Sequence, residues 1–387
     1  MRHITFAILA YACILPFSSG AQTFGWAVSM GAAQQDRSNA VATDAVGNVY
    51  TTGLFRGTVD FDPGAGIFSM TSTTYGSDMF VQKLDPSGNL LWAVKLDGDS
   101  LSGGLSITTD AAGYVYVAGG FRGSKDFEPG SGTYSMSSAG GVDAFILKLT
   151  PDGVFAWARR IGGPGNEIIG VIRCDHAGNV VFTGTFEGTA DFDPGAGVMN
   201  MTSAATSDPG TNVFVEKLGA DGSFLWARHL SGSYTAMQPL GIAFDASNSV
   251  VFSGSFFGTV DFDPGTPVHA ITVIGNNDMY VEKLDAAGNF LWVRRTGVSN
   301  WGGMSGIPLA DAAGNFYICG GFGGGGGTGT ADFDPGPAVY NLTAAFPGVD
   351  GFIWKLDNAG NFVWAKQMTA PGGWYSAEGA HMDANGN

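Results

Sequence analysis

The sequence predicts an all-β protein built from a tandem repeat of about 66 to 72 residues. A tryptophan returns at this spacing along the chain: Trp26, Trp92, Trp157, Trp226, Trp292 and Trp364. The string Asp-Phe-Asp-Pro-Gly occurs in four repeats, and a fifth carries Asp-Phe-Glu-Pro-Gly. The 387 residues include 62 glycines and only 13% charged residues, which is typical of short strands and tight turns rather than of helical bundles. A period of this length indicates modules that must stack on their neighbours to bury their apolar faces.

Residues 1–21 predict a cleaved signal peptide, and residues 22–387 a single repeat domain. Arg2 precedes an apolar run from Ile4 to Phe17, and small residues precede a cleavage point after Ala21. The alternative is a membrane anchor. It is disfavoured because a helix of about 14 residues rises only about 21 Å, whereas a bilayer core measures roughly 30 Å. We therefore expect a protein that is secreted or displayed on the outer cell surface, with no transmembrane segment.

The formal net charge of −16 makes the chain strongly acidic. Such a charge repels nucleic-acid phosphates and anionic lipid headgroups, so we expect neither as a partner. The mature chain has two cysteines, Cys174 and Cys319, which occupy different positions in their repeats. A disulfide between them is therefore not expected.

Each repeat contains four apolar stretches that we interpret as half-buried strands. In the second complete copy these are residues 105–109, 115–121, 144–149 and 154–161, in which apolar residues alternate with small or polar ones. Asp-x-x-Gly-Asn segments separate the stretches, as at Asp44 to Asn48 and Asp85 to Asn89. In these segments Asp can accept a backbone amide two residues on, and Gly-Asn can supply positive φ, so we expect hairpin turns. The copies at Asp110 and Asp245 lack the final Asn, and we expect slightly poorer turns there.

Four antiparallel strands in two hairpins, repeated around an axis, form a β-propeller blade. We predict five full repeats and a partial blade at each end, because the chain begins with a fourth strand at Phe24 to Met30 and stops after a first strand at Ala377 to Asn387. Residues 22–30 are expected to complete the last blade, and the domain to continue beyond Asn387. The recurrent tryptophan is expected to pack between neighbouring blades, with a carbohydrate-stacking platform as the alternative.

The Asp-Phe-Asp-Pro-Gly segments carry the candidate metal ligands. Residues two apart in extended chain share a face, so each segment presents two acids together. Ca²⁺ accepts oxygen ligands in irregular loops, which makes it a possible cofactor. The ten acids are Asp60, Asp62, Asp126, Glu128, Asp191, Asp193, Asp261, Asp263, Asp332 and Asp334.

The alternative role for these acids is structural, and it is the one we favour. Asp-Pro-Gly is a turn sequence in which the aspartate accepts the amide of the turn. The first acid also has a candidate ion-pair partner in a lysine of the third strand. This lysine recurs in every copy, as Lys83, Lys148, Lys217, Lys283 and Lys355.

No catalytic constellation is evident in the sequence. The histidines occupy unrelated repeat positions, and neither Gly-x-Ser-x-Gly nor His-Glu-x-x-His occurs. The glycine run Gly323 to Gly327 is interpreted as a flexible loop rather than a phosphate site, because no helix follows it. The segment from Asn300 to Ser305 departs most from the repeat pattern and is the best candidate for a unique surface.

The string Asp-x-x-Gly-Asn-Val-Tyr-x-x-Gly at Asp44 to Gly53, with variants such as Val115 to Gly119, resembles the seven-bladed β-propeller (SBBP) repeat family. The resemblance covers residues 24 to 387. It implies a secreted or surface-attached bacterial protein of the Bacteroidota type, with a sorting domain for type IX secretion beyond the present C-terminus. The family offers no catalytic residues to transfer, because propellers support enzymes and binding proteins alike.

We therefore expect an adhesion or interaction scaffold with no catalytic activity and an extracellular protein or glycan as its ligand. The alternative is an extracellular polysaccharide hydrolase or lyase with a site on one face of the propeller.

Overall fold

A computed structural model of the chain describes residues 25–31, 36–72, 76–97, 104–203, 211–232, 238–265, 268–275, 277–297, 303–323, 329–345 and 348–369. Every regular element in these residues is a β-strand, and every strand pair is antiparallel. Among the described residues there is no helix long and apolar enough to cross a membrane.

The strands form five four-stranded blades, each made from two consecutive hairpins as the sequence predicts. Blade 1 contains β1 (Arg37–Thr43), β2 (Val49–Phe55), β5 (Asp78–Leu84) and β6 (Leu90–Leu96); blade 2 contains β7 (Gly104–Thr109), β8 (Val115–Phe121), β11 (Asp143–Leu149) and β12 (Phe155–Ile161). Blade 3 contains β13 (Glu167–Cys174), β14 (Val180–Glu187), β17 (Thr211–Leu218) and β18 (Phe224–Gly232); blade 4 contains β19 (Gln238–Phe244), β20 (Val250–Phe256), β23 (Asp278–Leu284) and β24 (Phe290–Gly297). Blade 5 contains β25 (Gly303–Ala310), β26 (Phe316–Gly323), β29 (Val349–Leu356) and β30 (Phe362–Met368).

Each blade also carries a small hairpin that the sequence reading did not anticipate, inside the connection between its second and third strands. The hairpins are β3 (Thr58–Asp60) with β4 (Ser69–Thr71), β9 (Ser124–Asp126) with β10 (Ser135–Ser137), β15 (Thr189–Asp191) with β16 (Asn200–Thr202), β21 (Thr259–Asp261) with β22 (Ala270–Thr272), and β27 (Thr330–Asp332) with β28 (Asn341–Thr343). They were missed because strands of three residues are too short to show a period in the sequence.

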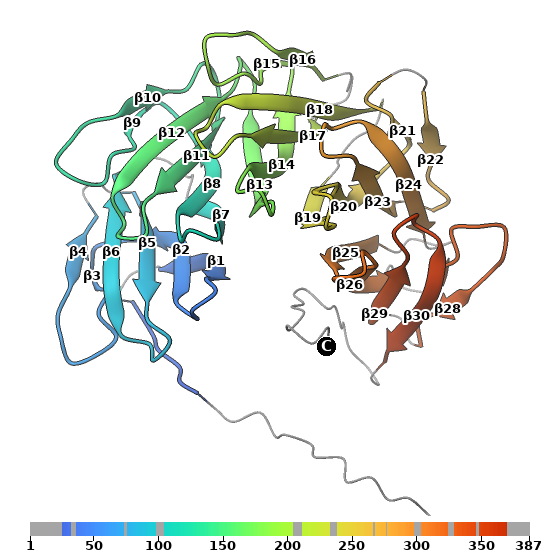
Figure 1. Cartoon of the computed structure of the whole chain (residues 1–387), viewed down its shortest axis with the longest axis horizontal. Helices are drawn as coiled ribbons and strands as arrows, with labels where there is room; N and C mark the ends of the chain where they lie inside the picture. Colours follow the sequence, from blue (N-terminus) through green and yellow to red (C-terminus); the bar gives the residue numbers. More distant parts are fainter. Residues whose placement is uncertain are drawn as a thin grey trace, which may run out of the picture.

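The blades follow one another in an arc around a common centre (Figure 1). The first strands, β1, β7, β13, β19 and β25, lie innermost and contact one another in succession. The fourth strands lie outermost, and β18 and β24 contact the small hairpin of the next blade, with β18 pairing with β21. This arrangement is that of a propeller, with apolar cores between consecutive blades.

The third strands are buried on both faces, which corrects the expectation of half-buried strands. Every residue of β5, β11 and β23 is buried. In blade 1, Met79 and Val81 of β5 pack in the core shared with blade 2, whereas Phe80 packs against Phe61 of the Asp-Phe-Asp-Pro-Gly segment. The outer strands are covered less completely, as in β6, which mixes buried and exposed positions. The apolar and small residues that alternate along a third strand therefore face two different cores.

The Asp-x-x-Gly-Asn turns form as predicted, although Gly and Asn have separate roles. Asp44 Oδ1 accepts the amide of Val46, and Gly47 has a φ of 88°. Asn48 does not adopt positive φ, and its side chain instead donates to Asp44 Oδ2 at 2.7 Å. The turn at Asp245 survives because Asn248 takes the glycine position with a φ of 59°.

Several predicted segments lie outside the described residues: the signal peptide (1–21), the glycines 324–327, Asn300 and Trp301, and the terminal strand Ala377 to Asn387. Residues 25–31 are described, and they are not in a strand, contrary to the sequence prediction. None of the described strands pairs with them, so no ladder fixes an extended backbone there.

Candidate functional site

The recurrent tryptophan joins each blade to the next, as predicted. Its indole Nε1 donates to a carbonyl in the turn between the third and fourth strands of the following blade, at 3.0 Å from Trp226 Nε1 to the oxygen of Ala286. The lysine of the third strand reaches the same oxygen, with Lys217 Nζ at 3.4 Å from it. The same paired donation joins Lys83 and Trp92 to Pro151, Lys148 and Trp157 to Ala220, and Lys283 and Trp292 to Asn358. These tryptophans are committed to contacts between blades, which disfavours the carbohydrate-platform alternative.

Three of the five third-strand lysines form ion pairs, but with a different acid from the one that we expected. Lys217 pairs with Asp175 at 2.8 Å, Lys283 with Asp245 at 2.7 Å and Lys355 with Asp311 at 3.8 Å. These aspartates begin the first Asp-x-x-Gly turns. The reason is strand direction, because in blade 1 Lys83 lies opposite Tyr50, near the start of β2, whereas Asp60 follows the far end of that strand.

The acids of the Asp-Phe-Asp-Pro-Gly segments accept backbone hydrogen bonds. Asp191 Oδ1 accepts the amides of Asp193 and Met199 at 3.0 and 2.8 Å, which closes the loop of the small hairpin. Asp193 Oδ1 accepts the amide of Gly195 at 2.8 Å, as the turn interpretation predicts. The same bonds recur at Asp60, Asp62, Asp126, Glu128, Asp261, Asp263, Asp332 and Asp334.

These acids do not gather into a metal-binding group. Within the described part of the chain, no group of three or more His, Cys, Asp or Glu side chains is placed to hold a metal ion. A Ca²⁺ ion takes six to eight oxygen ligands, and two acids per loop with amides already bound to them supply few. Calcium binding by these loops stays a hypothesis.

The two cysteines are free, as expected.

The phenylalanine of the segment anchors the small hairpin to its blade. Phe192 packs edge-on against Phe186 of β14 and Phe214 of β17, with ring centroids 5.2 and 5.0 Å apart. Equivalent aromatic triads occur in the other four blades. This contact fixes the position of each acidic loop on the side of its blade that faces the preceding blade.

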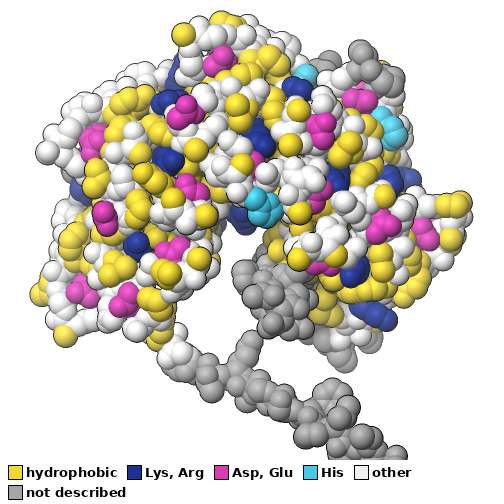
Figure 2. Space-filling model, in the orientation of Figure 1, with side chains coloured by type: hydrophobic (Ala, Val, Ile, Leu, Met, Phe, Trp, Pro, Cys, Tyr) yellow, Lys and Arg dark blue, Asp and Glu magenta, His cyan; other side chains and the backbone are white. Residues whose placement is uncertain are grey.

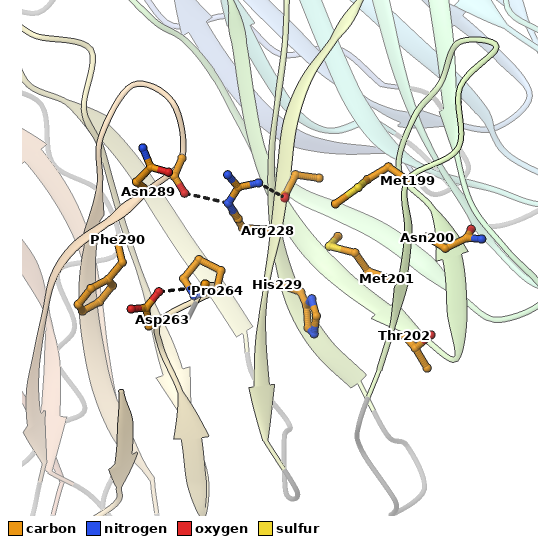
Figure 3. A pocket seen from close by; sticks show the side chains of 13 residues that line it. Met199, Asn200, Met201, Thr202, Arg228, His229, Asp263, Pro264, Asn289 and Phe290 are labelled. Carbon is orange, nitrogen blue, oxygen red and sulfur yellow. Dashed lines mark hydrogen bonds between the residues drawn. The ribbon is translucent and has the colours of Figure 1, made fainter. Parts of the chain in front are cut away.

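Three equivalent grooves open where an outer strand meets the acidic loop of the next blade. Groove 2/3, between blades 2 and 3, has a volume of about 260 Å³, and groove 4/5 about 470 Å³. Groove 3/4 is the largest of the three, at about 570 Å³. One of its walls is Met199 to Thr202, its floor is Ala227 to His229 of β18, and its other wall includes Asp263 and Phe290 (Figure 3).

Groove 3/4 is also where the repeat pattern changes chemically. In the other blades, the acid that begins the third strand bonds to a long polar side chain of the fourth: Asp78 with Lys95, Asp143 with Arg160, Asp278 with Arg295 and Asp350 with Gln367. In blade 3 the two positions hold Asn212 and His229. Asn212 instead donates to the carbonyl of Leu230 at 2.9 Å. Blade 3 thus has two neutral side chains, Asn212 and His229, where each of the other blades has an aspartate and its polar partner.

His229 lies on the floor of groove 3/4, beside Phe186 at a ring-centroid distance of 5.8 Å. Burial lowers its pKa below the ordinary value, so the ring is neutral at neutral pH. Arg228 is held in place by its bonds to the carbonyls of Gly288 and Ala227, at 2.9 and 2.8 Å. The groove therefore combines apolar side chains with the neutral ring of His229, the guanidinium of Arg228 and, at one edge, the carboxylate of Asp263. Over the visible face of the molecule as a whole, acidic, basic and apolar side chains are interspersed (Figure 2).

Groove 3/4 was not predicted from the sequence, although the repeats contain a signal for it. Aligning the repeats at their lysines places Asn212 where four copies have Asp, and His229 where the others have Lys, Arg or Gln. The segment that we singled out, Asn300 to Ser305, lies elsewhere in the repeat, and its side chains are outside the described residues.

No protein-family model matches the chain. An uncharacterized WD repeat-containing protein of Acanthamoeba polyphaga mimivirus is 26% identical over 225 residues, covering 52% of this chain. The chain matches only 16% of that relative's length. A protein of unknown function from Bacteroides caccae is similar with a TM-score of 0.36 and 11% identity, covering 86% of this chain and 82% of that one. Sqt1 from Chaetomium thermophilum gives a TM-score of 0.28 and 11% identity, covering 87% and 85%. Together with the blades, the repeat relative supports a propeller-like repeat protein.

Proposed function

We propose that the chain is a secreted or surface-displayed β-propeller that binds an extracellular glycan or protein, with groove 3/4 as its contact site. The observation that carries this proposal is the change at Asn212 and His229. It places a neutral imidazole on the floor of the largest of the three grooves, where each of the other two has an arginine. Binding sites combine apolar walls with a few converging polar groups, and Met199, Phe290 and His229 provide this combination here. The SBBP resemblance and the predicted signal peptide support export, with type IX secretion as the route.

Binding is favoured over polysaccharide cleavage by the groove's single carboxylate. Glycoside hydrolysis generally uses two carboxyl groups on either side of the scissile bond. Of the described residues that line groove 3/4, Asp263 alone carries a carboxylate, and its Oδ1 accepts the amide of Gly265. A scaffold that presents similar grooves in series also suits a repetitive ligand, because weak contacts add in avidity.

The proposal can be tested on a glycan array with a matched pair of variants. His229→Arg restores the cation of blades 2 and 4 and fills groove 3/4, so we expect it to abolish retention of any bound glycan. Gln367→Arg makes the same kind of change at the equivalent site of blade 5, which lies outside the three grooves, and should leave retention unchanged. Equal loss in both variants, or no loss in either, would contradict the assignment of groove 3/4.

A turnover screen on the same glycans separates binding from catalysis. We expect no release of reducing or unsaturated sugars. Release that disappears in Asp263→Asn would favour the hydrolase or lyase alternative. Export is tested separately by expressing the chain in a Bacteroidota host and sequencing the N-terminus of the extracellular protein, which should begin at Gln22.

A further inference from the structure

Two glutamates are completely enclosed within the blades. Glu216 on β17 and Glu282 on β23 are both 0% exposed. Neither oxygen of either carboxyl group has a hydrogen-bond partner when the groups are treated as carboxylates. An ionised carboxylate with no partner in an apolar interior is so costly that such a group takes up a proton instead.

The equivalent position of blade 1 shows what the site accepts. The residue before the third-strand lysine is Gln82 in blade 1, and it aligns with Glu216 and Glu282. Gln82 is also 0% exposed, and its Nε2 donates to the backbone carbonyl of Phe61 at 2.6 Å. Phe61 is the phenylalanine of the Asp-Phe-Asp-Pro-Gly loop. A hydrogen-bond donor in this site therefore fastens the acidic loop to the middle of its blade.

We propose that Glu216 and Glu282 are held as neutral carboxylic acids whose hydroxyl groups donate to the backbone carbonyls of Phe192 and Phe262. The two protons are thus structural parts of blades 3 and 4, and they do there what the Gln82 amide does in blade 1. Blades 2 and 5 have Leu147 and Trp354 at this position and need no proton.

The surroundings of Glu216 favour the protonated form. Burial raises the pKa of its carboxyl well above the ordinary value, and the negative charges of Asp193 and Asp191 raise it further. The residues directly opposite it on the neighbouring strands are Phe182 and Ala227, which carry no charge. The core between blades 2 and 3 contains the titratable side chains of Tyr116 and Cys174, whose pKa values are raised by burial so that both are neutral, and Tyr114 packs against it.

Glu282 has the same kind of surroundings. Burial raises its pKa, followed by the charges of Asp263 and Asp261. Its neighbours across the ladder are Phe252 and Val293. Tyr280, two residues before it on the same face of β23, is fully buried, and burial raises its pKa so that it too stays neutral. Asp278 of this strand pairs with Arg295, and Lys283 pairs with Asp245. The charged groups that shift the pKa of the two glutamates are all aspartates, and none of them is basic.

The consequence is a fold that weakens as the medium becomes alkaline. A carboxyl whose pKa is higher in the folded than in the unfolded chain makes stability fall as pH rises from the unfolded to the folded pKa. Within that window each glutamate raises the unfolding equilibrium constant by up to about tenfold per pH unit. The loops involved form walls of grooves 2/3 and 3/4, whereas the loop of groove 4/5 is backed by Trp354.

The test uses the full chain, the variant Glu216→Gln/Glu282→Gln, and Gln82→Glu. Denaturant unfolding is measured from about pH 5 to pH 9, and the ratio of each variant's unfolding constant to that of the wild type is followed. As pH rises, the double variant should become more stable than the wild type. The ratio of its unfolding constant to that of the wild type should fall by up to about a hundredfold per pH unit, because two groups contribute. For Gln82→Glu the same ratio should rise with pH, by up to about tenfold per pH unit. Ratios that do not depend on pH would overturn the proposal.

Infrared spectroscopy gives a readout that requires no unfolding. The wild type minus the double variant should show the carbonyl band of a protonated carboxylic acid at neutral pH, and a carboxylate band there would overturn the proposal. If the double variant does not fold, the single variants provide the same difference spectrum one group at a time. Calcium chloride added to wild type and variant should shift neither melting temperature. A shift confined to the wild type would identify a cation site at Glu216 or Glu282 and would also overturn the proposal.

Discussion

Lys217 and Asp175 form a buried ion pair, with Nζ and Oδ2 2.8 Å apart and side chains 5% and 0% exposed. Burial alone would raise the pKa of Asp175, but hydrogen bonds from Lys217 and Asn179 outweigh it and leave the pKa below the ordinary value. The lysine also donates to Ala286 of the next blade. One ammonium group therefore ties the first turn of blade 3 to the second turn of blade 4.

Removing this ammonium should destabilise the protein strongly. Lys217→Met leaves Asp175 buried without its cation, and breaking a buried pair in this way costs about 3–5 kcal/mol. Lys355→Met is the matched control, because Lys355 and Asp311 are 3.8 Å apart and both partly exposed, so its loss should cost at most about 1 kcal/mol. Denaturant unfolding of both variants at neutral pH measures the difference. Similar costs for the two would show that the ammonium of Lys217 has no special role.

The tryptophans predict a second contrast. Trp226 is 6% exposed and donates to Ala286, so Trp226→Ala should cost about 3–5 kcal/mol through lost packing and the lost hydrogen bond. Trp364 is half-buried and makes no inter-blade hydrogen bond among the described residues, so Trp364→Ala should cost less. Melting temperatures of the two variants make the comparison. A larger loss for Trp364→Ala would mean that a further blade covers it.

The sequence was a good guide wherever the repeat period itself carried the information. Trp226 was placed between blades, and the turn at Asp44 was located, because each recurs with the same neighbours in other copies. The predicted ion-pair partner of Lys217 was wrong. Which acid lies near the lysine depends on the direction in which neighbouring strands run, and an alignment of repeats does not give that direction. The burial of Glu216 was not predicted, because both faces of a third strand become buried only when the blades pack against one another.

Groove 3/4 was missed for a different reason. A catalytic site adds reactive groups to a repeat, whereas this site arises from a loss, as Asn212 and His229 replace the acid and its partner found in other blades. A cavity between two modules also depends on how they pack, which no single repeat encodes. Comparing copies for missing charges, as well as for new ones, would have found it.

The turn glycines predict a third contrast, between two positions with the same backbone. Gly178 and Gly288 both have a φ of 79°. A Cβ on Gly178 would meet nothing within 4 Å, whereas one on Gly288 would lie 2.7 Å from the Trp226 ring. Gly178→Ala should therefore lower the free energy of unfolding only by the strain of a left-handed alanine backbone, about 1–2 kcal/mol. Gly288→Ala should cost more, because the indole must move as well. Equal unfolding free energies for the two variants would contradict the packing of Trp226 against this turn.

The half-buried His229 predicts a loss of stability in acid that a neutral substitute should remove. Burial lowers its pKa below the ordinary value of 6.5, so the folded chain holds it neutral while the unfolded chain binds a proton. Stability from this group is complete above about pH 6.5 and falls as pH decreases towards the folded pKa, because the unfolded state then binds more protons. His229→Gln should flatten that part of the stability curve. His269→Gln is the control, since His269 is exposed at the edge of groove 4/5. Unfolding curves from about pH 7 to pH 5 measure both variants, and a decline that persists unchanged in His229→Gln would assign it to other groups.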